Sequence, residues 1–306
     1  MLDVFNINDN SLTNQVFYHN GVNAWQVWHK PPNCNFINFY LLGGGAGGQG
    51  GFTGGTGTVR NGGAGGGSAA VAYITVPEFA IPNMLYVLVA SGGTGGLPNG
   101  GAGSRGGLSY ISTQPDNTLA PLNILMVNGS AAAGVTTSAT AGAVITANNI
   151  VLAEIGFTSA YAGQTGGAGG AGSTAAVNIT PSGLPTTAGA GGSGISVSVL
   201  GRGGSIIGIL DFPTISGSTG SLTGTSFNGN DGYSTRENFI GPNFKYPMFF
   251  TGGAGGGATN TGTSSAGGNG SFGCGGGGGG AGSTGTTFSN SKGGNGGDGL
   301  VIITAS

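Results

Sequence analysis

Residues 273–280 read GCGGGGGG, and the chain closes soon afterwards with NGGDGLVIITAS (295–306), which ends in a strand-like apolar run. The first stretch holds six consecutive glycines, Gly275 to Gly280, and the chain has 73 glycines in 306 residues. Glycine costs about 0.5–1 kcal/mol relative to alanine in regular structure, so ordering them all costs on the order of 40–70 kcal/mol. Folded proteins are stable by only about 5–15 kcal/mol. The tracts therefore either stay disordered or form a structure that only glycine can build.

The composition argues against disorder. Disordered chains combine low hydrophobicity with many charges, whereas this chain is 37% hydrophobic and 5% charged, with a formal net charge of −2. We therefore expect the glycine tracts to be ordered. So few lysines and arginines cannot form the basic surface that binds phosphates, and nucleic acid is not an expected partner.

Targeting and membrane signals are not evident in the sequence. The N-terminus, MLDVFNINDN (1–10), has no basic region followed by an apolar one, so we expect no signal peptide. No apolar run approaches the ~18 residues of a membrane span, so we expect no membrane insertion. Cys34 and Cys274 lie far apart. Two unpaired thiols are the simpler interpretation, and a disulfide between them stays open.

Glycine-rich blocks alternate with short runs of strand-like residues. The blocks lie near 43–67, 92–107, 163–172, 187–204, 252–283 and 293–299. The strand-like runs are INFYLL (37–42), AAVAYITV (69–76), MLYVLVA (84–90), LSYIS (108–112), LNILMV (122–127), NIVLAEI (149–155), ISVSVL (195–200), SIIGIL (205–210) and LVIIT (300–304). Apolar and β-branched residues in such short runs indicate strands, and no segment has the apolar spacing of a helix. We expect an all-β chain.

A hairpin is expected near the N-terminus. VFYH (16–19) and VNAWQVW (22–28) flank Asn20-Gly21, and this pair of residues favours the tight turn that joins two antiparallel strands.

The glycine blocks are too long for ordinary loops. An extended helix of the polyproline II type has about three residues per turn and no internal hydrogen bonds, so its backbone groups need partners elsewhere. Glycine helices packed side by side supply those partners, and only glycine allows the close approach. Blocks such as GGAGG (62–66) and GGNGG (293–297) fit this arrangement, since one residue in three points outward.

We therefore predict a jelly-roll-like β-sandwich whose long glycine-rich loops pack as polyglycine II helices. Residues 1–36 are expected to form an N-terminal hairpin or attachment segment, and residues 37–306 the glycine-rich β-sandwich domain.

The order of elements also resembles a known family. WHKPP (28–32) precedes a strand that runs into GGGAGGQGG (43–51), and GGNGGDGLVIIT (293–304) closes the chain. This order is similar to the glycine-rich domain of bacteriophage tail-fibre, receptor-binding and other virion-surface proteins, and more distantly to the fibre-tip adhesins of T-even-type phages. The resemblance implies a homo-oligomer on the virion, assembled in the host cytoplasm, with other virion proteins and a host-surface glycan or protein as partners.

Catalytic and cofactor motifs are missing from the sequence. Matches to G-x-G-x-x-G, such as 43–48, arise by chance at this glycine content, and no helix follows them. His19 and His29 are the only histidines, and the acids are scattered. NGNDGYSTRE (228–237) has the wrong register for a calcium loop. We expect no enzyme activity, no metal and no cofactor.

One segment, 226–250, gathers aromatic and charged residues without periodicity. Such residues dominate binding hot spots; alternatively, they cover the open edge of the sandwich or pack against neighbouring copies. The candidate receptor- or partner-binding residues are Phe227, Tyr233, Arg236, Phe244, Lys245 and Tyr246. Phe52, Arg60 and Arg105 are further expected to be presented at turns of the glycine-rich loops.

These observations predict a virion protein for host-surface recognition, of the fibre or spike type. A capsid decoration or minor capsid protein is the alternative. An ice-binding protein is a remote third, against which the irregular threonine spacing argues.

Overall fold

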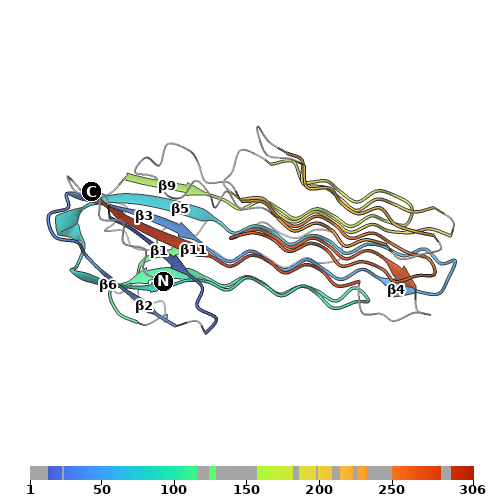
Figure 1. Cartoon of the computed structure of the whole chain (residues 1–306), viewed down its shortest axis with the longest axis horizontal. Coiled ribbons are helices and arrows are strands. Elements are labelled where there is room, and N and C mark those ends of the chain that lie inside the picture. Colours follow the sequence, from blue (N-terminus) through green and yellow to red (C-terminus); the bar gives the residue numbers. More distant parts are fainter. Residues whose placement is uncertain are drawn as a thin grey trace.

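The computed structural model describes residues 13–22, 24–115, 124–128, 157–181, 186–197, 199–208, 214–222, 226–232, 250–283 and 291–306. The molecule is elongated, with β-sheets at one end and glycine-rich segments running side by side toward the other (Figure 1). Among the described residues the only helix is one 3-10 turn, η1 (Glu78–Ala80), so the predicted all-β class is confirmed. The described helical residues include no stretch long and apolar enough to span a bilayer.

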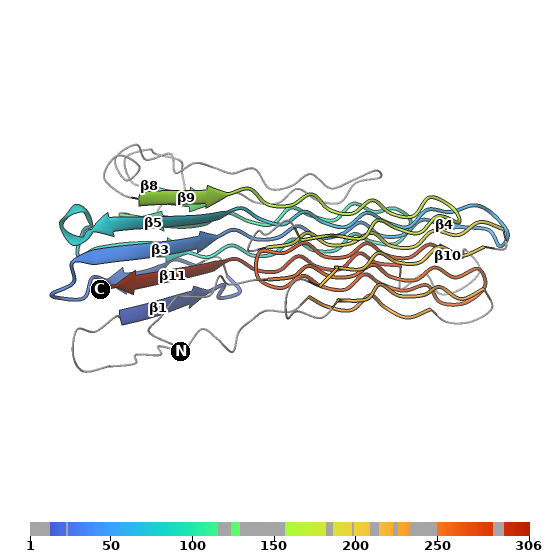
Figure 2. The same cartoon turned by 90° about the horizontal axis from the view of Figure 1, so that it is seen from above.

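Two antiparallel sheets form one end of the molecule (Figure 2). The larger sheet has the strand order β1-β11-β3-β5-β9, with β1 (Thr13–Tyr18), β11 (Leu300–Ala305), β3 (Phe36–Leu42), β5 (Val71–Pro77) and β9 (Phe157–Tyr161). The smaller sheet has the order β2-β6-β7-β8, with β2 (Gln26–His29), β6 (Met84–Leu88), β7 (Ser109–Ser112) and β8 (Ile124–Asn128). A short parallel pair, β4 (Thr53–Gly54) and β10 (Gly282–Ser283), lies at the opposite end of the molecule.

The largest buried cluster draws side chains from both sheets: β1, β3, β5 and β11 of the larger, and β2, β6 and β7 of the smaller. In β3, Ile37, Phe39 and Leu41 belong to this cluster, while Tyr40 and Leu42 belong to a second cluster. Successive side chains of a strand point to opposite faces. Both faces of β3 are therefore buried, which explains its almost unbroken apolar sequence.

The predicted N-terminal hairpin is not formed. Gly21 adopts the expected turn conformation, with φ of 81°. However, β1 pairs with β11 and β2 pairs with β6, so the turn carries the chain from one sheet to the other. β1 and β2, which precede residue 36, pair with β11 and β6, which follow it.

Most predicted strand runs are confirmed. The runs at 37–42, 69–76, 84–90, 108–112, 122–127 and 300–304 coincide with β3, β5, β6, β7, β8 and β11. Two predicted strand runs, 195–200 and 205–210, do not form strands over the residues that the structure describes. ISVSVL ends a glycine-rich segment in a turn, where Ser196 N donates to Val199 O (2.9 Å). SIIGIL lies among glycine-rich segments, where Ile206 is buried. The run at 149–155 lies outside the described residues.

The strands continue into the glycine-rich segments, which we call the glycine bundle. It comprises 43–52, 61–68, 91–97, 101–107, 163–171, 174–179, 187–195, 200–208, 214–222, 226–232, 251–259, 263–271, 274–282 and 291–299. The segments attached to β11, β3, β5 and β9 keep the neighbour order of their strands: Gly48 donates to Gly294, and Gln49 to Ala64. The sheet thus sets the register of the bundle.

Backbone hydrogen bonds in the bundle repeat every three residues. In segment 43–52, the amides of Gly44, Gly47 and Gly50 donate to segment 101–107, those of Gly45, Gly48 and Gly51 to segment 291–299, and those of Ala46, Gln49 and Phe52 to segment 61–68. Successive amides therefore point in three directions around the segment.

The central segment, 274–282, explains the six glycines. Its amides donate to segments 43–52, 187–195 and 263–271, and its carbonyls accept from segments 61–68, 251–259 and 291–299, so other segments enclose it on every side. A Cβ added at Gly278 would lie 1.9 Å from the carbonyl oxygen of Gly63, one at Gly279 would lie 2.2 Å from that of Ser291, and one at Gly280 would lie 2.0 Å from that of Gly257. No side chain fits at these positions.

Candidate functional site

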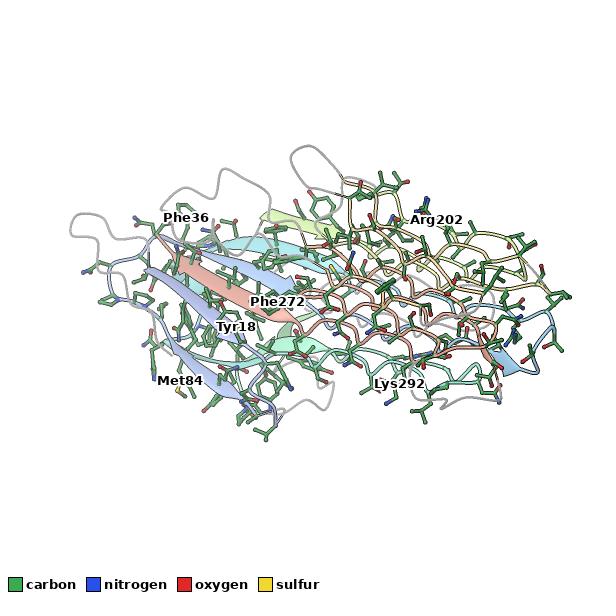
Figure 3. All side chains as sticks on the ribbon, turned by 45° about the vertical axis from the view of Figure 1, so that its right-hand side comes forward. Tyr18, Phe36, Met84, Arg202, Phe272 and Lys292 are labelled. Atoms are coloured by element: carbon green, nitrogen blue, oxygen red, sulfur yellow. The ribbon has the colours of Figure 1, made fainter. Side chains whose placement is uncertain are left out.

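Segments on the outside of the bundle carry their long polar side chains where no neighbouring segment covers the backbone. In segment 291–299 the exposed residues are Lys292, Asn295 and Asp298, three residues apart, and the glycines between them face other segments. Lys292 lies at the periphery of the molecule in Figure 3. The G-G-x spacing of the sequence is thus the spacing of outward-facing positions.

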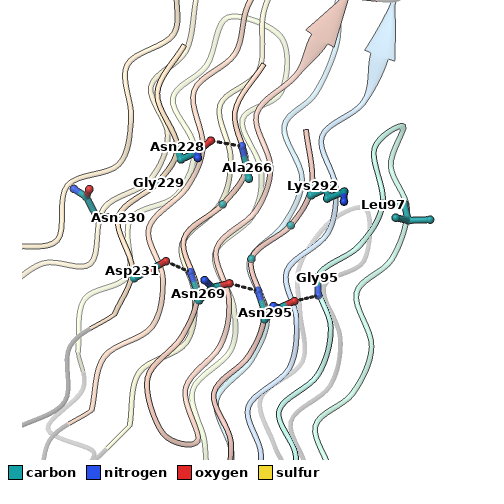
Figure 4. A pocket seen from close by; sticks show the side chains of 13 residues that line it. Gly95, Leu97, Asn228, Gly229, Asn230, Asp231, Ala266, Asn269, Lys292 and Asn295 are labelled. Carbon is teal, nitrogen blue, oxygen red and sulfur yellow. Dashed lines mark hydrogen bonds between the residues drawn. The ribbon is translucent and has the colours of Figure 1, made fainter. Parts of the chain in front are cut away.

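Four such segments lie next to one another: 91–97, 291–299, 263–271 and 226–232 (Figure 4). Gly296 N donates to Gly93 O, Gly270 N to Asn295 O and Gly229 N to Ala266 O, at 2.8, 2.8 and 2.9 Å. Together they line an open depression of about 610 Å³. We call five of its polar lining residues the amide face: Asn228, Asp231, Asn269, Lys292 and Asn295.

A row of side-chain hydrogen bonds crosses the amide face. Asp231 Oδ1 accepts from the backbone N–H of Asn269 (2.6 Å), and Asn269 Oδ1 accepts from that of Asn295 (2.9 Å). Asn295 Oδ1 in turn accepts from the N–H of Gly95 (2.8 Å), and a second row begins with Asn228 Oδ1 and the N–H of Ala266 (3.0 Å; Figure 4). A surface amide has no further segment to accept from it, and these side chains take the place of the missing carbonyl.

These bonds determine how the side-chain amides are oriented. Because a backbone N–H can only donate, the atom it meets must be Oδ1, and Nδ2 is left on the other branch of each amide. Among the described residues, no protein acceptor is bonded to Nδ2 of Asn228, Asn269 or Asn295, and Lys292 makes no ion pair. The amide face therefore presents donors in set orientations beside the single carboxylate of Asp231.

A second exposed surface lies in the loops at the end of the bundle far from the sheets. It includes Val59 (63% exposed) and Val197 (61% exposed). These loops are tied together, since Arg60 and Ile195 exchange backbone hydrogen bonds of 2.9 and 2.8 Å. We call Val59, Val197, Val199 and Leu222 the distal valine–leucine group.

Arg60 is not presented at a turn, contrary to prediction. It is 4% exposed, and its guanidinium donates to Gly54 O (3.2 Å), Gly282 O (2.5 Å) and Asn260 Oδ1 (2.7 Å). Carbonyl groups at the ends of the glycine segments need donors, and Arg60 supplies them. Burial lowers the pKa of this guanidinium from its ordinary value. Arg105 is exposed as predicted, whereas Phe52 is half-buried.

Of the predicted binding residues, Phe227 is described by the structure. It is 76% exposed and directly precedes Asn228 of the amide face. The other predicted binding residues lie outside the described residues: Tyr233, Arg236, Phe244, Lys245 and Tyr246. Sequence reasoning missed the amide face itself, whose signal is the asparagine, aspartate or lysine at every third residue of KGGNGGD (292–298).

The cysteines are both free: Cys34 is half-buried, and Cys274 is buried in the second cluster, together with Tyr40 and Leu42. This confirms the interpretation of two unpaired thiols.

Comparison with protein families gives a match over residues 21–306, to a family described as a glycine-rich domain. The chain belongs to this family. No curated protein matches the chain. The predicted glycine-rich domain is thereby confirmed, and the match covers both sheets and the bundle except for β1.

The opening motif of this glycine-rich domain has a structural role. Trp28 is buried and packs edge-on against Phe39, with ring centroids 6.3 Å apart. Lys30 pairs with the Glu78 carboxylate (2.6 Å) and donates to Ile81 O (2.9 Å). Trp28 and Lys30 of the WHKPP segment therefore complete the core and hold the 3-10 turn in place.

Proposed function

We propose that this glycine-rich domain is an exposed structural protein of a bacteriophage virion that recognises the host surface as part of a fibre or spike. The order of its sequence elements, which resembles phage virion-surface proteins, supports this proposal. We also propose homo-oligomerisation and contacts with other virion proteins, as that resemblance implies.

We further propose that the two sheets form a β-sandwich of the jelly-roll-like kind and that the glycine segments are polyglycine II helices. The buried cluster that draws on both sheets supports the first. The three-residue period of the backbone hydrogen bonds supports the second, because a helix with about three residues per turn points successive amides in three directions.

The observation that carries the recognition proposal is the exposed distal valine–leucine group on a tightly bonded bundle. Its loops lie at the end opposite the C-terminus and the sheets (Figure 1). Binding residues tend to sit on loops held by a rigid scaffold. A rigid binding surface also loses less conformational entropy when its partner binds.

The test uses the whole chain fused to a fluorescent protein and a panel of bacterial strains. We expect retention on susceptible strains, and loss of retention in the double variant Val59→Asp, Val197→Asp. The matched control is Val177→Asp, since Val177 is an exposed valine (51%) in segment 174–179 that does not belong to the distal valine–leucine group. Equal retention of both variants, or no retention of the wild type on any strain, argues against recognition by these loops.

The capsid-decoration alternative has a different signature. The same exposed valines also suit contacts with a neighbouring subunit. The number of copies per virion therefore distinguishes a decoration protein from a fibre or spike. Mass spectrometry of purified particles that finds hundreds of copies per virion favours decoration, and a few copies favour a fibre or spike.

A further inference from the structure

We infer that the amide face binds an extended, uncharged polysaccharide. This rests on the proposed recognition function and names the class of receptor for one surface. The amide face is distinct from the distal valine–leucine group, because it lies along the side of the bundle on segments 91–97, 226–232, 263–271 and 291–299.

The hydrogen-bonding chemistry favours a ligand rich in acceptors. Nδ2 of Asn228, Asn269 and Asn295 and Nζ of Lys292 are donors without protein partners in the described structure. The bonds through Oδ1 hold each amide in one orientation, so little side-chain entropy is lost on binding. Hydroxyl and acetamido oxygens of a sugar chain accept such bonds.

The charge of the face argues against a charged ligand. Lys292 and Asp231 lie on the same depression with opposite charges, and Asp298 adds a further negative charge on segment 291–299. A polyanion would meet these carboxylates, and a polycation would meet Lys292 and the outward amide donors. An uncharged polymer avoids both penalties.

The shape and borders of the face suit a chain more than a single small molecule. Two donors, Lys292 and Asn295, lie three residues apart on segment 291–299, about 9 Å in an extended helix of this type, and Asn269 and Asn228 lie on the neighbouring segments. Exposed Leu97 lines one side of the depression (Figure 4). The apolar side chain of Leu97 can pack against the C–H face of a sugar ring.

The variants remove the side-chain donors and keep the side-chain hydrogen bonds of the fold. In the double variant Asn269→Asp, Asn295→Asp, both Oδ1 acceptors are kept, so the side-chain rows can still form, but both Nδ2 donors are replaced by oxygens. The matched control is Asn178→Asp, because Asn178 Oδ1 accepts from Ser205 N (2.8 Å) on segment 174–179, away from the amide face. Lys292→Gln is a second variant. It removes the positive charge of one donor and leaves both rows of side-chain hydrogen bonds in place, because Lys292 belongs to neither row.

Binding is measured on an array of purified neutral and acidic bacterial polysaccharides, followed by calorimetry with the best neutral one. We expect wild type and Asn178→Asp to bind alike, the double variant to bind about tenfold or more weakly, and Lys292→Gln to bind a few-fold more weakly. Thermal melts show whether each variant is folded.

Two results overturn the inference. One is binding to bacterial cells without binding to any neutral polysaccharide, which leaves the proposed function standing with another receptor. The other is salt-sensitive preference for the acidic polysaccharides. If wild type binds neither cells nor polysaccharides, the proposed function itself fails.

Discussion

At the residue scale, the number of neighbouring segments determines where glycine is required. Positions that face another segment are either glycines without room for Cβ, as at Gly275 to Gly280, or small buried residues such as Ala190 and Ala254. An uncovered position takes a longer side chain, as at Lys292 and Asn295. The run of six glycines therefore marks the most enclosed segment. This differs from the use of glycine for positive φ, which is confined to a few turns such as that at Gly21.

A substitution in the central segment tests this directly. Gly278→Ala places a Cβ 1.9 Å from the carbonyl oxygen of Gly63, so a segment must move. We expect a loss of stability of about 1–3 kcal/mol or more, measured by thermal or denaturant unfolding. Gly55→Ala is the matched control, because its Cβ would have only Thr58 Cγ2 within reach, at 3.8 Å. Equal stability of the two variants would contradict the steric argument.

The buried thiol gives a second residue-scale prediction. Burial raises the pKa of the Cys274 thiol far above its ordinary value, only partly offset by a backbone hydrogen bond from Thr187. The reactive species of cysteine is the thiolate. At pH 8 we expect that a thiol reagent does not modify Cys274 in the folded protein, so that Cys34 is the one cysteine that can react. After unfolding we expect both cysteines to react. Rapid native reaction of two thiols would show that the bundle opens easily around Cys274.

At the element scale, three strands of the larger sheet carry a contiguous group of tyrosines. Tyr73 of β5 lies between Tyr40 of β3 and Tyr161 of β9, with ring centroids 4.8 and 6.4 Å apart. Burial, with a contribution from Tyr161, raises the pKa of Tyr73 to about 12. Burial, with contributions from Tyr73 and Cys274, also raises the pKa of Tyr40. The sheet therefore keeps the hydroxyls of Tyr40 and Tyr73 protonated in alkaline solution.

This arrangement predicts alkaline destabilisation. In the unfolded chain Tyr73 returns to a pKa near 10, so between about pH 10 and 12 the unfolded state binds fewer protons than the folded state, and stability falls as pH rises. Tyr73 alone accounts for a loss of roughly 2–3 kcal/mol across that window. Denaturant unfolding at a series of pH values measures the slope. Tyr73→Phe should have a shallower slope above pH 10, and an unchanged slope would exclude Tyr73 as its source.

At the scale of the whole molecule, sheets and bundle are a single interlocked structure. Strands β3 and β11 run directly into segments that stay hydrogen-bonded to each other through the bundle. The central segment receives bonds from parts of the chain as distant as Gly63 and Gly294. Loss of one end therefore removes partners at the other.

We consequently expect one unfolding transition for both ends. The only tryptophans, Trp25 and Trp28, report on the sheet end through fluorescence, and exposure of the Cys274 thiol reports on the start of the central bundle segment, where it meets the sheet. Their denaturant midpoints should coincide, as in a two-state transition. In hydrogen exchange, amides 275–280 should be among the slowest of the chain. Separate midpoints, or fast exchange at 275–280, would indicate a bundle that unfolds independently.

Much of the element pattern could be predicted from local sequence. Runs such as INFYLL and LVIIT are apolar, short and β-branched or aromatic, and they form β3 and β11. The run SIIGIL has the same local chemistry but lies in the bundle, where Ile206 packs in a small buried cluster with Ala188, Ala190 and Ala254. Its surroundings, and not its own residues, decide its conformation. The hairpin prediction at Asn20-Gly21 was wrong for the same reason. The turn is set by local sequence, but the strands on its two sides pair with β11 and β6.

The candidate site, too, could be predicted from the sequence only in part. Outward positions of KGGNGGD can be recognised in the sequence, because its three residues with long polar side chains, Lys292, Asn295 and Asp298, are the exposed ones. That Asp231, Asn269 and Asn295 form one row could not be recognised, since their segments are brought together by backbone hydrogen bonds that are the same for any glycine pair.

The sequence by itself determined which backbones can pack closely, because a missing Cβ is a local steric property that depends on no partner. Only the tertiary structure decided which segments are neighbours. Uniform glycine backbones carry no side chains to distinguish one partner from another, and the order of the strands from which they emerge makes that choice.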